Sequence, residues 1–234
     1  MKLAIMQPYF FPYLGYWQLI NAVDEFIIYN NVAYIKNGWI NRNSILIQDK
    51  PHLITLPLQN ASSFKSINEI DILNNKKNIT NAIKTINMAY SKAPYFKDVF
   101  DIITNIFDNY SQNKIDIFNY NVILKINKYL NINTKITLAS ELKEINTNLK
   151  GQDKILEICK NLNAKQYINA IGGQDLYDKE TFAKNNIQLN FIKMNEIKYQ
   201  QFNNEFVPNL SIIDILMFNP PEKIKEMLDD YELI

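Results

Sequence analysis

The chain has 234 residues, a formal net charge of +1 and a hydrophobic content of 47%. This length suits one large domain, and so small a net charge gives no field that would attract nucleic acid or an anionic membrane. No apolar run approaches the roughly 20 residues that span a bilayer, and the single cysteine excludes an internal disulfide. We therefore expect a globular, cytoplasmic protein that neither binds nucleic acid nor inserts into a membrane.

The first apolar run, residues 3–6, predicts a strand that leads directly into a segment rich in aromatic residues and proline. Residues 7–13 of this segment are called the aromatic loop below. A helix over residues 16–23 and a strand over residues 26–29 complete a βαβ opening. Ligands of such sheets bind at the carboxyl end of a strand, next to a helix N-terminus. We expect the binding site at this loop; the alternative is that its aromatic residues only plug the end of the sheet.

The middle of the chain changes from strand patterns to helix patterns. Residues 32–35, 44–47 and 53–58 predict short strands. Apolar spacing then predicts three helices, over residues 79–90, 94–110 and 115–130. We expect these helices to form an insertion or subdomain, at about residues 74–131, in an α/β core.

The α/β pattern resumes after this block. Strands are predicted at residues 135–139, 166–171 and 187–194, and helices after residues 150–153 to about 162, at residues 181–185 and at residues 212–218, with a last helix beginning at Pro220-Pro221. Strands that alternate with helices predict a mainly parallel sheet. The expected fold is therefore a single α/β domain over residues 1–234.

The tetrad Tyr13-Leu14-Gly15-Tyr16 lies where nucleotidyltransferases of the HUP-like class carry His-x-Gly-His, between a first strand and its helix. In that signature the histidines stabilise charge that develops on the transferred phosphate. A tyrosine hydroxyl donates a hydrogen bond but supplies no cation, so the same chemistry does not follow. We expect Tyr13 and Tyr16 to be hydrogen-bond donors in catalysis. Ser211, at the start of a helix, resembles the phosphate-binding Ser-Ser-Thr element of those enzymes.

Arg42 is the only arginine, and it follows a Gly-Trp pair. Its planar, permanently charged guanidinium suits bidentate recognition of phosphate or carboxylate. We expect Arg42 to bind such a group, with the flanking Asn41 and Asn43 orienting the substrate. The alternative is a surface salt bridge.

Two weaker candidates follow later in the chain. Gly172-Gly173 comes directly after a predicted strand, where tandem glycines suit close approach to an anion, although a plain turn is the alternative. Asp214 is the best candidate for a general base, or else the acidic partner of Ser211 in a capping box. The single histidine, His52, and Cys159 look incidental, and no metal site is expected.

Four segments together resemble the WbqC-like protein family: residues 6–16, 38–43, 167–173 and 206–214. The resemblance covers nearly the whole chain. It implies a bacterial protein from gene clusters for O-antigen, capsule or other surface polysaccharides. It also implies a role in moving an amino acid, such as glycine, onto a sugar, but it supplies no catalytic residues.

Two functions remain open from the sequence. The first is a transferase that acts on a sugar or nucleotide sugar, with an acyl donor activated by ATP or delivered by an acyl-carrier protein. In it, Gln7 would orient the substrate, the aromatic loop with Tyr9 would stack on the sugar or base, and Trp39 would be a further substrate-binding residue. The second is a non-catalytic nucleotide-sugar or protein-binding module of a polysaccharide assembly complex, which the lack of a nucleophile motif favours.

Overall fold

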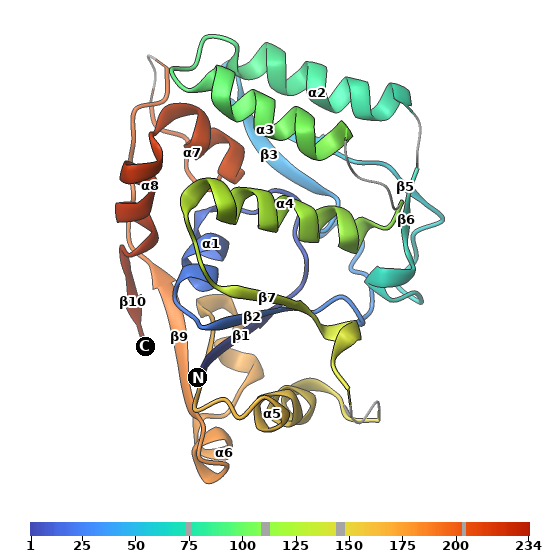
Figure 1. Ribbon diagram of the computed structural model, residues 1–234, viewed down its shortest axis with the longest axis vertical. Helices are drawn as coiled ribbons and strands as arrows, with labels where there is room; N and C mark the ends of the chain where they lie inside the picture. The colour runs from blue at the N-terminus through green and yellow to red at the C-terminus, as the bar shows by residue number, and fades with distance from the viewer. Residues whose placement is uncertain (74–75, 109–112, 144–147, 203–204) are drawn as a thin grey trace.

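The computed structural model describes residues 1–73, 76–108, 113–143, 148–202 and 205–234. A six-stranded sheet forms its centre, with the strand order β10-β9-β8-β1-β2-β7 (Figure 1). All strand pairs are parallel except that of β10 with β9. The strands are β1 (Lys2–Met6), β2 (Glu25–Ile28), β7 (Lys135–Leu138), β8 (Gln166–Ala170), β9 (Gln188–Met194) and β10 (Tyr231–Leu233). The prediction of a mainly parallel α/β sheet is confirmed.

The strand order places a topological switch point at β1. From β1 the chain moves outward through β2 to β7, and it then crosses to the other side of β1 to form β8 and β9. In doubly wound sheets, ligands bind outside the carboxyl ends of the strands where the order reverses. The predicted βαβ opening is also confirmed, because β1, the helix α1 (Leu14–Asn21) and β2 follow in sequence with β1 and β2 paired in parallel.

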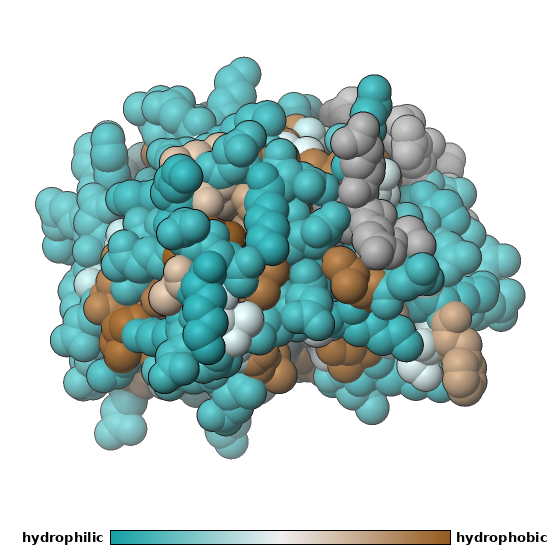
Figure 2. Space-filling view, turned by 90° about the horizontal axis from the view of Figure 1, so that it is seen from below, coloured by the Kyte–Doolittle hydropathy of each residue, from teal (hydrophilic) through white to brown (hydrophobic). Residues whose placement is uncertain are grey.

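Helices cover both faces of the sheet (Figure 1). One face carries α1, α4 (Ile115–Leu130) and α8 (Pro221–Leu228), and the other carries α5 (Gly151–Asn161) and α6 (Lys179–Lys184). The buried apolar side chains divide accordingly into two clusters, the smaller one beneath α5 and α6. Figure 2, which shows the molecule from that side, displays a mainly hydrophilic surface with scattered apolar side chains.

The segment between β2 and β7 carries a hairpin of β3 (Arg42–Ile47) and β4 (Lys50–Thr55), and then the short strands β5 (Leu58–Gln59) and β6 (Asp71–Ile72). Its further helices are α2 (Lys76–Tyr90) and α3 (Phe96–Asp108), which precede α4. The larger apolar cluster joins these helices to α1. This continuity supports the proposal of one domain, residues 1–234, with a helical insertion at about residues 74–131.

Two strand predictions need correction. Residues 32–35 form no strand, and only an isolated bridge joins Ala33 to Ser66. The strand predicted at 53–58 is β4 and begins at Lys50, because Gln48 and Asp49 adopt positive φ of 49° and 60° and close a two-residue hairpin turn. Such turns match the twist of the strands they join. The short strands β5, β6 and β10 were not predicted.

Candidate functional site

The aromatic loop leaves the carboxyl end of β1 and is held by side chains from distant elements. Asn43 donates from Nδ2 to the carbonyl oxygens of Phe10 at 3.1 Å and Phe11 at 2.8 Å. The Ser211 hydroxyl donates to the same Phe11 carbonyl at 2.7 Å. Asn119 of α4 donates to the carbonyl of Pro8 at 3.0 Å. Each of these three side chains is buried, so the loop backbone is satisfied from inside the protein.

The aromatic rings of the loop divide between core and surface. Phe10 and Phe11 are fully buried, and Phe10 stacks on Phe118 with centroids 5.9 Å apart. Phe11 has a φ of 41°, which a bulky residue rarely adopts. These two rings therefore plug the end of the sheet, whereas Tyr9 and Tyr13 remain partly exposed.

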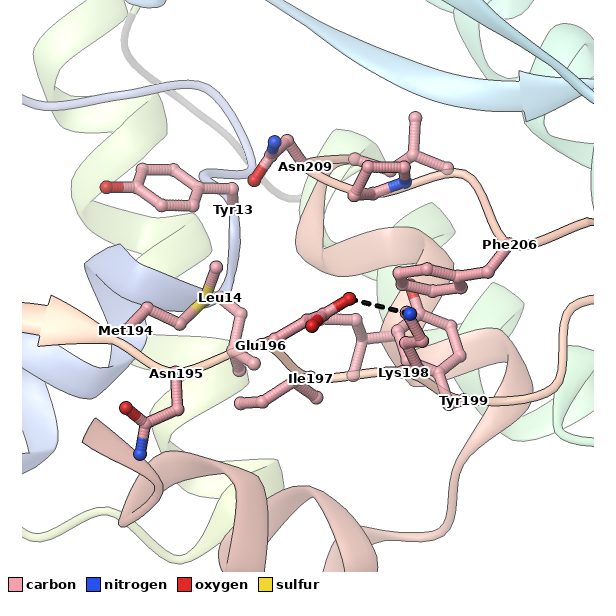
Figure 3. Close-up of a pocket in the computed structure, with 13 residues that line it drawn as sticks. Tyr13, Leu14, Met194, Asn195, Glu196, Ile197, Lys198, Tyr199, Phe206 and Asn209 are labelled. Atoms are coloured by element: carbon pink, nitrogen blue, oxygen red, sulfur yellow. Dashed lines mark ion pairs between the residues drawn. The ribbon is translucent and has the colours of Figure 1, made fainter.

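A cavity of about 380 Å³ opens beyond β9, between the start of α1 and the loop that precedes α7 (Ile212–Phe218) (Figure 3). Its volume lies within the range of small-molecule sites. Both polar and apolar side chains line the cavity, among them Tyr13, Glu196, Lys198, Tyr199, Phe206 and Asn209. Most of its wall comes from the connection between β9 and α7, namely from residues 195–199, 206 and 208–210.

Tyr13 lines this cavity from the start of α1. Its ring lies against Gly15, where an added Cβ would come within 2.6 Å of the Tyr13 Cε2 atom. A glycine at position 15 is therefore what lets the Tyr13 ring occupy this place. Burial raises the pKa of the Tyr13 hydroxyl, so it stays protonated as a hydrogen-bond donor.

An ion pair provides charge in the wall of the cavity. Lys198 Nζ lies 2.6 Å from Glu196 Oε1, as the dashed line in Figure 3 marks. The hydrogen bond from Lys198, together with its charge, lowers the pKa of the Glu196 carboxyl. Both side chains are largely exposed, so either one is free to exchange its partner for a ligand group.

Asp214 lies behind the cavity and has no exposed surface. Its Oδ1 accepts a hydrogen bond from the Tyr90 hydroxyl at 2.8 Å. Its Oδ2 accepts from the Tyr199 hydroxyl at 2.6 Å and from Gln201 Nε2 at 2.7 Å. Burial raises the pKa of Asp214, although these hydrogen bonds oppose the shift. Because Tyr199 lines the cavity, its hydroxyl group connects Asp214 to the cavity.

Several residues predicted from sequence to act in substrate binding or catalysis make hydrogen bonds to the protein backbone. Asn41 is buried, accepts from the Tyr34 hydroxyl at 3.0 Å and donates to the carbonyl of Leu56 at 2.9 Å. Tyr16 is also buried, and its hydroxyl donates to the carbonyl of Gln7 at 2.9 Å. Of the predicted site residues, Tyr13 lines the cavity, while Ser211 and Asp214 support the helix that follows its wall.

The remaining predicted residues do not line this cavity. Arg42 donates from Nε to the carbonyl of Gly38 at 3.1 Å and from its terminal nitrogens to Asn37. Among the described residues no carboxylate pairs with Arg42, so the alternative of a surface salt bridge is not observed. Trp39 is about half exposed.

Gly172 and Gly173 belong to a 3-10 helix, Ile171–Leu176, at the carboxyl end of β8. Neither has a positive φ. Gly173 packs against the Asn169 side chain, which an added Cβ would approach to 3.2 Å. This close approach accounts for a glycine at position 173, and nothing comparable surrounds Gly172.

The cavity contains residues that were not assigned to the site from the sequence, namely Glu196 and Lys198, together with Phe206 and Asn209 of the segment 206–214. One signal was present, because polar residues follow directly on an apolar strand whose carboxyl end lies at the same edge as that of β1. No cluster of three or more metal-ligating side chains occurs in the described parts of the chain. Within those parts, no helix is long and apolar enough to span a bilayer.

Fold and site define a class: a doubly wound α/β protein whose cavity lies where strands of its parallel sheet end. The model of the WbqC-like protein family matches residues 7–226, so the chain belongs to that family. It is also similar to the uncharacterized protein Rv1507c of Mycobacterium tuberculosis, with 26% identity over 218 residues that cover 92% of each chain. No solved structure matches the chain significantly.

Proposed function

We propose that this protein is a transferase of bacterial surface-polysaccharide biosynthesis. It would join a small acyl group or amino acid, such as glycine, to the amino group of a sugar or nucleotide sugar. One observation carries the proposal: the start of α1 and the loop before α7 line the same cavity. These are the two segments that resemble elements of HUP-like nucleotidyltransferases. The presence of both segments in one cavity supports a site that binds an activated, phosphate-bearing group.

The cavity has groups suited to each part of amide formation. The sugar amine attacks the acyl carbonyl carbon, and the leaving group departs with the electrons of the broken bond. Glu196, ionised at neutral pH, would accept the proton that the amine loses. Lys198 would attract the phosphate of an ATP-derived donor or of the nucleotide sugar. Tyr13 would donate a hydrogen bond to the oxygen on which charge develops.

Asp214 would act as a positioning residue in this reaction. Its two oxygens already accept three hydrogen bonds, and the carboxylate has no exposed surface. Through Tyr199 and Gln201 it fixes the segment that forms the cavity wall. The predicted roles of Arg42, Trp39 and the Gly172-Gly173 turn stay predictions, since these residues lie outside the cavity lining.

The test is amide formation by purified protein, with ATP and glycine or with an acylated carrier, on an amino-sugar nucleotide. Glu196→Gln should lower turnover by about 100-fold or more, which is the usual contribution of a general base. The matched control is Glu226→Gln, which breaks a similar exposed ion pair with Lys223 on α8. The control should keep full activity. No turnover with any donor, or equal loss in both variants, would refute the proposal.

The alternative is a non-catalytic module that binds a nucleotide sugar. The complete burial of Asp214, the residue predicted to be the general base, favours this alternative. Ligand binding is read separately, as the rise in melting temperature on adding ATP or a nucleotide sugar. A rise that Lys198→Met removes, with no turnover by wild-type protein, would select the module.

A further inference from the structure

A second surface, outside the cavity, carries large exposed apolar side chains. Phe64 is 98% exposed, Ile35 53% and Trp39 48%. Single exposed apolar residues are common on monomeric proteins, whereas a group of them marks an interaction site. The question is therefore whether these three side chains lie together.

Backbone contacts bring the three residues to one place. Ala33 pairs with Ser66 in an antiparallel bridge, and the amide of Tyr34 donates to the carbonyl of Lys65 at 2.9 Å. Ile35 and Phe64 are each the next residue after this hydrogen-bonded pair, Phe64 within a turn in which the amide of Lys65 donates to the carbonyl of Ser62 at 3.0 Å. The amide of Gly38 then donates to the carbonyl of Ile35 at 3.3 Å, and this turn brings Trp39 back toward Ile35.

Positive charge surrounds these residues. Lys36 and Lys65 flank Ile35 and Phe64 in the sequence, and neither has an ion-pair partner among the described residues. Arg42 reaches back to the turn that carries Trp39. In segments 33–43 and 62–69, the one carboxylate is that of Glu69, which accepts a hydrogen bond from the amide of Ser66 at 2.7 Å. An apolar centre with a basic rim fits a partner with acidic side chains.

The surface is connected to the aromatic loop. The amide of Phe10 donates to the carbonyl of Trp39 at 2.8 Å. Phe10 precedes the cavity-lining Tyr13 by three residues, a span of at most about 11 Å between Cα atoms. A partner docked on this surface would thus lie beside the loop that leads to the cavity.

We propose that Ile35, Trp39 and Phe64, with Lys36 and Lys65, form the docking surface for an acidic carrier protein that delivers the acyl donor. The choice of a carrier rests on the proposed transferase function. In the transfer, the thioester C–S bond breaks while the sugar nitrogen forms the new C–N bond. The amine proton passes to the departing thiolate, by way of Glu196, so no further reactant is needed.

The test is direct binding of a purified acidic acyl carrier protein in its phosphopantetheinylated form, measured by fluorescence anisotropy at about 20 mM salt, where charge attraction is weakly screened. The double variants Lys36→Glu/Lys65→Glu and Ile35→Ser/Phe64→Ser should each weaken binding by about tenfold or more. Matched controls on another face are Lys179→Glu/Lys184→Glu of α6 and Leu176→Ser, which is also largely exposed. These controls should bind as wild-type protein does.

Three results would overturn the proposal: no binding of the carrier to wild-type protein, equal loss in the controls, or self-association through this surface. Sedimentation of wild-type and Ile35→Ser/Phe64→Ser protein detects the last of these. The thermal shift with ATP separates this proposal from the transferase function. Docking-surface variants should keep that shift, and Glu196→Gln should keep carrier binding.

Discussion

Replacing Asp214 with asparagine tests whether the buried carboxylate holds the cavity wall. Asparagine keeps the shape but has one acceptor oxygen, whereas the two carboxylate oxygens accept from Tyr90, Tyr199 and Gln201. If the amide oxygen faces Tyr199 and Gln201, the buried Tyr90 hydroxyl loses its acceptor. Such an orphaned donor costs about 1–3 kcal/mol.

Two further contributions set the net effect of Asp214→Asn. The remaining hydrogen bonds change from charge-assisted to neutral, which roughly halves their strength. Removing a buried charge offsets part of that loss. We expect a net decrease in the free energy of unfolding of about 2–3 kcal/mol, or roughly 4–12 °C in melting temperature for a chain of this size. The assay is urea unfolding followed by fluorescence of the buried Trp17.

The pH dependence of this difference has a defined sign. Burial raises the pKa of Asp214 in the folded protein. At pH values between the ordinary aspartate pKa and this raised pKa, the folded state therefore holds a proton that the unfolded chain has released. Wild-type stability therefore falls as pH rises through this window, and Asp214→Asn lacks that contribution. The gap between the two proteins should be widest near the ordinary aspartate pKa and narrow as the pH rises. The exposed Asp175→Asn is the control. A gap below about 0.5 kcal/mol, as is usual for surface changes, would refute the reasoning.

Three other changes test the site and the core. Asn43→Ala should lower the free energy of unfolding by about 1–3 kcal/mol in urea titrations, because it removes the side-chain donor of the buried Phe10 carbonyl and leaves the Phe11 carbonyl with the Ser211 hydroxyl alone. Gly15→Ala should displace the Tyr13 ring and reduce the thermal shift with ATP, and an unchanged shift would count against a ligand there. Burial raises the pKa of Cys159 to about 12, so its thiol should react with a disulfide reagent only after unfolding; fast reaction of native protein would contradict this.

The sequence predicts much of this fold because its helices have strong periodicity. The helices expected at residues 115–130 and 212–218 have those same bounds in the structure. The strand at residues 231–233 was missed because three residues show no alternation, and only pairing with β9 makes them a strand. The strand predicted at residues 32–35 does not form, because the one pairing that this segment makes in the described part of the chain is the isolated bridge from Ala33 to Ser66, and Ala33 and Ile35 stay exposed.

The site could be predicted only in part. Its location follows from the order of strands and the loop after β1, and of the residues predicted for the site Tyr13 lines the cavity. Asn41, Asn43 and Ser211 were assigned to the substrate because an amide or hydroxyl suits either a ligand or a backbone carbonyl, and sequence does not distinguish the two. Glu196 and Lys198 belong to an irregular segment without periodicity, so their place directly after an apolar strand was the one signal for them in the sequence.

The aromatic loop and most of the cavity wall come from two separate stretches of the chain. Asparagine and serine side chains hold the loop through its backbone carbonyls, and most of the cavity wall comes from residues 195–199, 206 and 208–210. Because these side chains bind carbonyls of the aromatic loop, they determine the shape of that loop and do not determine the reaction. Substitutions in the cavity wall are therefore the way to change ligand specificity, because the side chains that hold the aromatic loop can stay as they are.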